Sequence, residues 1–216
     1  MPYTTVQELI NRCKRQLMEE LEYDGVRWSN AEAVEWLNEF YQLACARIPE
    51  QFSQSVAFVC SAGTMQVIPS DMLILVRVTR NLDGKKRAVR PALMPTLDMA
   101  KPDWHAADEA DQAEVFCLDP ALPRAFWVYP PAVSGLRLEM VGAYAPDPHT
   151  EDDYTDGAEV IRCPDVMAPA AVDYVLSRCF GKDSEVATSA ARESAYLQTS
   201  MAKLAVVADS FRGGRK

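Results

Sequence analysis

Apolar residues recur at helical spacing near the start of the chain. A first apolar stripe covers about residues 5–21, and Gly25 follows it as a residue suited to a left-handed helix end. A second stripe covers about residues 30–48. Ser29 and Glu32 have the spacing of a capping box before this stripe, and Pro49 ends it. The pattern predicts two antiparallel helices joined by a short loop.

In the middle of the chain, apolar and polar residues follow the shorter period of β-strands. Short apolar or alternating runs occupy residues 55–60, 64–69, 72–79, 86–90, 114–118, 125–129 and 136–144. Asn81-Leu-Asp-Gly84 has the composition of a turn. Prolines at 130, 131, 146 and 148 mark strand ends, because proline donates no backbone hydrogen bond to a sheet. These runs predict a small antiparallel sandwich or open barrel.

Helical spacing returns after Pro164, first in a segment that ends near Gly181 and then in a last helix over about residues 183–209. Residues 147–157 are polar and acidic, and they predict a loop. The fold class is therefore α+β: N- and C-terminal helices form a bundle, and a small antiparallel β domain is inserted between them. We expect the bundle in residues 1–52 and 160–210, the β domain in 53–150, and a flexible tail in 211–216.

The balance of acidic and basic residues narrows the classes of function that the sequence allows. Acidic residues outnumber basic ones by 31 to 22, and the formal net charge is −9. Since affinity for the phosphate backbone comes from Lys and Arg, this balance argues against a protein whose main task is binding nucleic acid. A local basic patch stays open.

The six cysteines are widely spaced and form no CxxC pair, so a zinc site of the usual spacing is excluded. We see no signal-peptide pattern and no apolar run near the roughly 20 residues of a membrane helix. We therefore expect a reducing, cytosolic compartment, with the cysteines as small buried hydrophobic residues.

Candidate catalytic residues are few. His105 and His149 are the only histidines, and they lie in different predicted loops. The sequence contains no GxSxG, GxxxxGK[ST] or GxGxxG motif. An EF-hand frame on Asp156-Gly157 puts Tyr154 where a ligand oxygen is needed. We expect no enzyme, no metal and no cofactor; the alternative, a hydrolase that uses either histidine, predicts that replacing both abolishes an activity.

Two charged segments of opposite sign follow each other in the predicted β domain. The basic segment consists of Arg77, Arg80, Lys85, Lys86, Arg87 and Arg90, and the acidic segment contains Asp98, Asp103, Asp108, Glu109, Asp111 and Glu114. Each could be an ordinary solvated face. The sharper hypothesis is that they are complementary subunit interfaces in a ring. A nucleic-acid-binding module that uses the basic hairpin at 77–90 is the alternative function. No aromatic residue lies among these bases to stack on nucleotides, which counts against it.

The chain ends in a basic segment with one aromatic residue, which contains Phe211, Arg212, Arg215 and Lys216. A frayed terminus is the ordinary interpretation. The functional alternative is a peptide that becomes ordered in the groove of a partner.

Several segments resemble the head-to-tail adaptor, or connector, proteins of short-tailed phages, which include the tail tubular protein A type. Asp24-Gly-Val-Arg-Trp-Ser-Asn-Ala-Glu32, followed by Glu35-Trp-Leu-Asn38, resembles the N-terminal signature of that family. Similar matches in order are Val78-Thr-Arg-Asn81, Asp103-Trp-His105, Asp119-Pro120, Arg124-Ala-Phe126, Val128-Tyr-Pro-Pro131, Val172-Asp-Tyr-Val-Leu176 and Lys182-Asp183. The resemblance covers nearly the whole chain, but the acidic segment Asp147 to Asp156 matches none of its motifs.

This resemblance implies a structural virion protein with a β domain inserted in a helical bundle. Adaptors of this kind form a ring, usually twelve-fold, beneath the portal protein in the neck of the virion. The ring retains packaged DNA, which passes through the channel without specific binding, and it is a platform for the tail nozzle and tail fibres. The resemblance also implies that the C-terminal segment docks on the portal, that assembly occurs in the host cytoplasm, and that no membrane, cofactor or catalytic residue is involved.

Overall fold

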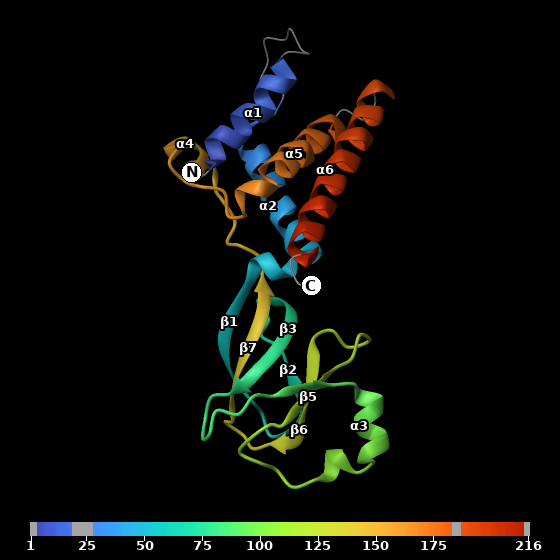
Figure 1. Ribbon diagram of the computed structural model, residues 1–216. Helices are drawn as coiled ribbons and strands as arrows, with labels where there is room; N and C mark the ends of the chain where they lie inside the picture. Colours follow the sequence, from blue (N-terminus) through green and yellow to red (C-terminus); the bar gives the residue numbers. More distant parts are fainter. Residues whose placement is uncertain (1–3, 19–27, 183–186, 214–216) are drawn as a thin grey trace. The chain divides into compact units, whose positions relative to one another are not determined.

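The computed structural model describes residues 4–18, 28–182 and 187–213. The chain divides into two compact units (Figure 1). One consists of residues 1–51 and 146–216, and the other of residues 52–145. The first is helical and the second is built from strands, so the α+β fold class predicted from the sequence is confirmed.

In the helical unit, helix α5 is the central element. The helices are α1 (Val6–Met18), α2 (Asn30–Arg47), α4 (Glu151–Asp156), α5 (Ala168–Gly181) and α6 (Ala187–Gly213), with short 3₁₀ turns at Pro49–Phe52 and Asp165–Met167. Helices α1, α2 and α6 all contact α5, and α6 lies alongside it (Figure 1). Ten of the residues of α5 are buried, including Asp173, whose carboxylate pairs with Lys203 of α6 at 2.5 Å.

The N-terminal ends of two helices show how local sequence positions this unit. The capping box predicted at Ser29 is present: Ser29 Oγ accepts from the amide of Glu32 at 3.1 Å, and Glu32 Oε2 accepts from the amide of Ser29 at 3.0 Å. The predicted loop at 147–157 is wrong in part, because it contains the short helix α4. Its first turn is closed by Asp153, which accepts from the amide of Thr150 at 2.8 Å.

The β unit contains two sheets. The first has the strand order β1 (Ser53–Val59), β7 (Arg137–Tyr144), β3 (Met72–Asn81), and the second has the order β2 (Gly63–Val67), β6 (Ala125–Ala132), β5 (Val115–Leu118), β4 (Arg90–Ala92). All pairs are antiparallel except β4 with β5, which is parallel. Parallel neighbours need a long connection that brings the chain back to the end of the sheet where the first strand began. Between β4 and β5 this connection contains helix α3 (Met94–Ala100) and a 3₁₀ turn (Trp104–Ala106).

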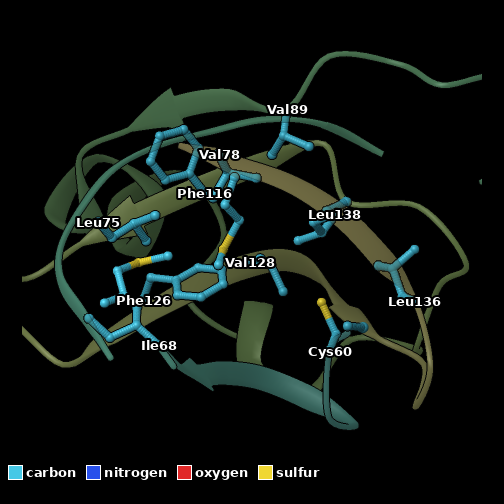
Figure 2. Close-up of a cluster of buried hydrophobic side chains, with 14 residues drawn as sticks. Cys60, Ile68, Leu75, Val78, Val89, Phe116, Phe126, Val128, Leu136 and Leu138 are labelled. Atoms are coloured by element: carbon cyan, nitrogen blue, oxygen red, sulfur yellow. The ribbon is translucent and has the colours of Figure 1, made fainter. Parts of the chain in front are cut away.

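Two apolar clusters stabilise the β unit. Figure 2 shows the larger one, in which side chains from both sheets meet, among them Leu75, Val78 and Leu138 from the first sheet and Phe126 and Val128 from the second. The smaller cluster lies on the other face of the second sheet, where Trp104 packs on Cys117, Ala125 and Trp127. Helix α3 and the 3₁₀ turn therefore act as a cover for that face.

Strand β3 is bulged, which the sequence did not indicate. Its register against β7 shifts three times, between Met72 and Ile74, Leu75 and Arg77, and Val78 and Arg80. The buried positions of β3 consequently fall on every third residue: Met72, Leu75, Val78 and Asn81. Each bulge adds a residue to one strand and increases its twist, so β3 bends strongly along its length.

Candidate assembly surfaces

The basic segment forms the end of β3, a tight turn and the approach to β4. All six of its basic residues are exposed: Arg77, Arg80, Lys85, Lys86, Arg87 and Arg90. Arg80 pairs with Glu139 of β7 at 2.9 Å. Among the described residues, the other five have no ion-pair partner. Their charges are therefore available to a partner molecule.

The turn itself is fixed by its one acidic residue. Asp83 accepts a hydrogen bond from the Arg137 guanidinium at 2.5 Å and another from the Arg137 amide at 3.2 Å. The bonds from Arg137 hold the pKa of Asp83 below its usual range. Gly84 and Lys86 have positive φ angles of 58° and 52°. Because these bonds fix the backbone of the turn, Lys85 and Lys86 project from a fixed position.

The end of the acidic segment lies beside this basic turn. Asn81, which is fully buried, donates to the carbonyl oxygens of Ala113 at 2.8 Å and of Arg87 at 3.0 Å, and it accepts from the Ala113 amide at 2.8 Å. The side chain of Gln112 lies against Gly84. One asparagine therefore holds two segments of opposite charge side by side, and sequence reasoning missed it.

The acidic residues singled out as interface candidates, Asp103, Asp108, Glu109 and Asp111, are all exposed. Although the two charged segments are neighbours, no ion pair joins these four to a basic residue within the described ranges. The β unit thus presents exposed charges of both signs that are unpaired among the described residues.

The two histidines have different surroundings. His105 is exposed and stacks on the buried Trp104, with ring centroids 3.7 Å apart. Its Nδ1 lies 2.9 Å from the hydroxyl of Thr64. Within the described part of the chain, no carboxylate hydrogen-bonds to this ring to orient it as a general base.

His149, by contrast, is buried, with 3 % of its surface exposed. Its Nδ1 lies 3.2 Å from Asp153 Oδ2, and its ring packs on Tyr41. Burial lowers its pKa, and the charge of Arg162 lowers it further, against the opposing effect of Asp153. Its surroundings are those of a structural residue that fixes the segment before α4.

All six cysteines are buried, as predicted, and none is in a disulfide. Burial raises the pKa of the Cys60 and Cys163 thiols to about 12. Because the thiolate is the nucleophilic form, these side chains are inert at neutral pH. Within the described residues, no three His, Cys, Asp or Glu side chains are grouped as metal ligands would be.

In the described ranges, neither histidine and neither of the Cys60 and Cys163 thiols is placed as a catalytic group. The model of the SU10 adaptor protein family matches residues 4–215, which is nearly the whole chain. The chain belongs to the SU10 adaptor protein family. No curated protein matches it. The predicted family of phage head-to-tail adaptors is confirmed.

This adaptor is accordingly a structural phage protein of the virion neck, where it links portal and tail components. None of the helices in the described ranges is both long enough and apolar enough to cross a membrane.

The C-terminal segment of the adaptor begins inside a helix. Helix α6 extends through Gly213, so Phe211 and Arg212 belong to it rather than to the tail predicted from residue 211. A glycine in a helix costs only about 1 kcal/mol relative to alanine, which is too little to end a helix by itself. Phe211 is 39 % exposed. Arg215 and Lys216 lie outside the described residues.

Proposed function

We propose that this adaptor forms a ring of twelve subunits, the number usual in the family, between the portal and the tail nozzle of a short-tailed phage. The ring retains packaged DNA and carries the nozzle and tail fibres. The observation that carries the proposal is the match of nearly the whole chain to a phage adaptor family. The net charge of −9 supports it, because an acidic ring repels the DNA that it conducts.

The charged surfaces provide the subunit contact in this proposal. The basic residues of one copy face Asp103, Asp108, Glu109 and Asp111 of the next copy. The support is that both sets are exposed and that the four acids have no ion pair to a base within the described part of the subunit. Unlike patches that meet head to tail close into rings when the rotation allows.

A charge-swap experiment tests this contact. The basic-turn variant carries Lys85→Glu, Lys86→Glu and Arg87→Glu, and the acidic variant carries Asp108→Lys, Glu109→Lys and Asp111→Lys. We expect either variant alone to lose assembly on a portal ring and an equimolar mixture to regain part of it, since only the mixture brings unlike charges together between copies. Full assembly by each variant alone, with unchanged circular dichroism, would exclude these residues from the contact.

The proposed contact with the portal uses the C-terminal segment, through Phe211, Arg212, Arg215 and Lys216. The support is that Phe211 is an exposed aromatic residue at the end of a long helix, followed by basic residues. An exposed aromatic residue beside cations is a common anchor at protein interfaces. Deletion of residues 211–216 is expected to abolish binding to a portal ring in light scattering. The variant Phe211→Ser separates the contribution of the anchor from that of the charges.

A further inference from the structure

An apolar groove opens on the β unit between the edges of its two sheets. It has a volume of about 640 Å³ and is lined by residues of β3, of β4 with its flanking positions, and of β5. Eight of the ten lining residues are apolar, and Leu93 and Leu118 are 74 % and 42 % exposed. A volume of this order and a mostly apolar lining with a few polar groups are typical of ligand-binding sites.

The groove exists because the two sheets separate after a short bridge between the end of β3 and the segment before β4. The amide of Asn81 donates to the carbonyl oxygen of Arg87 at 2.9 Å, and the amide of Val89 donates to that of Thr79 at 3.1 Å; the second bond marks the closed end of the groove. Val78, Val89 and Phe116 lie close together in the core at this end (Figure 2). Further along, β3 and β4 are each the outer strand of their sheet. Beyond the bridge, β3 and β4 are therefore not hydrogen-bonded to each other, and the two sheets do not close into a barrel on this side.

The strand edges determine how a partner could bind. Strand β3 has three bulges, and β4 has only three residues with Pro91 in the middle. Bulges, short length and proline are the features that prevent an edge from pairing with a further strand. An occupant is consequently held by side chains in the groove rather than by a regular ladder of backbone hydrogen bonds.

The charge of the groove determines which partner fits. Arg77 lines it, and no acidic residue does. Arg87 and Arg90 are exposed on the segment that leads into β4. The adaptor's own C-terminal segment is basic and is therefore repelled. A second copy's acidic segment at 106–114 contains alanine but no large apolar residue to fill the volume.

We infer that this groove binds an extended segment of a partner protein in which one large aliphatic or aromatic residue is flanked by Asp or Glu. The apolar residue enters between Val76, Leu93 and Leu118, and a flanking carboxylate pairs with Arg77. Of the groove residues, Arg77 alone is also assigned to the proposed ring contact, and the apolar lining is not.

Selection from a random peptide library displayed on phage, with the full-length chain as bait, tests the inference. We expect the selected peptides to share an apolar residue with acidic neighbours. Their affinity is then measured by fluorescence anisotropy against Leu93→Asp and Arg77→Glu, which should each weaken binding about tenfold or more, equivalent to about 1.4 kcal/mol. Leu93 is the N-cap of α3, where aspartate is a favoured residue, so this variant is compatible with the fold.

Matched controls are Leu122→Asp and Arg47→Glu, which change an exposed leucine and an exposed base outside the groove and outside the proposed ring contact. Their affinities should stay within about twofold of the wild type. A basic or polar consensus, no enrichment at all, or equal losses in the controls would overturn the inference. If Leu93→Asp instead lowers the mass of the self-assembled chain without peptide, the occupant is a second copy and the inference is wrong.

Discussion

Asn81 offers the sharpest stability prediction, because a single side chain joins the basic turn to the end of the acidic segment. It makes three hydrogen bonds to backbone groups, one to Arg87 and two to Ala113, and it is fully buried. In the variant Asn81→Ala the amide and the carbonyl of Ala113 lose this partner, whereas the Arg87 carbonyl keeps the bond from the backbone amide of residue 81 at 2.9 Å. No neighbouring strand replaces the bonds to Ala113, which lies outside the named strands.

The magnitude follows from the number of bonds. A hydrogen bond contributes about 0.5–1.5 kcal/mol net, so three contribute about 1.5–4.5 kcal/mol. The loss should stay in the upper half of this range, because buried groups left unpaired also lose hydration. The variant Asn81→Asp should be no better, since it replaces the amide donor by an acceptor that faces two carbonyl oxygens.

The assay is urea unfolding combined with amide hydrogen exchange. Asn81→Ala should lower the unfolding midpoint of the β unit and remove the exchange protection of the Ala113 amide. Asn38→Ala is a matched control, because Asn38 makes the same reciprocal pair with the backbone of His149 at 2.9 and 2.8 Å, but in the helical unit. A loss below about 1 kcal/mol in Asn81→Ala, with Ala113 still protected, would refute the role assigned to this side chain.

Three further predictions concern local structure. Because the pKa of His149 is lowered in the folded state, the unfolded chain binds a proton there more readily. The free energy of unfolding should therefore be retained above about pH 6.5 and fall as the pH drops below it. Urea midpoints at about pH 7.5 and 5.5 should differ in this direction in the wild type and in His105→Gln, and should differ less in His149→Gln. Gly142→Ala should destabilise by about 1–3 kcal/mol, because a Cβ there would meet Cγ of the buried Met72 at 2.8 Å; a Tm equal to that of the wild type would contradict this. Ser29→Ala should cost about 1 kcal/mol by removing the cap of α2, whereas Ser29→Asp should restore most of it in thermal unfolding.

The sequence predicted those features whose signals are local. The capping box at Ser29 was found because a serine and a glutamate three residues apart are sufficient to form it. The cap of α4 was missed because Asp153 takes the place of the usual Glu or Gln, and because the surrounding acids resemble a solvated loop. The helical residues 210–213 were missed because the glycines ahead indicated an earlier end, although one glycine in a helix costs only about 1 kcal/mol.

Features that depend on tertiary contacts could not be predicted. The three bulges of β3 appear only when its register against β7 is known, since its sequence, Met72-Leu-Ile-Leu-Val76, is an ordinary apolar run. The charged segments were recognised in the sequence, but their side-by-side placement depends on Asn81, one polar residue at the end of a strand. The groove likewise forms where β3, β4 and β5 come together, and their spacing depends on how the two sheets pack.

The central proposal, a ring-forming adaptor that docks on a portal, is tested most directly by mass measurement in solution. Purified chain is mixed with a portal ring, and the complex is sized by light scattering beside the chain alone and a chain that lacks residues 211–216. The account predicts a complex that carries one adaptor for each portal subunit with the full chain, and none with the shortened one. A full-length chain that leaves the mass of every portal ring unchanged would contradict it.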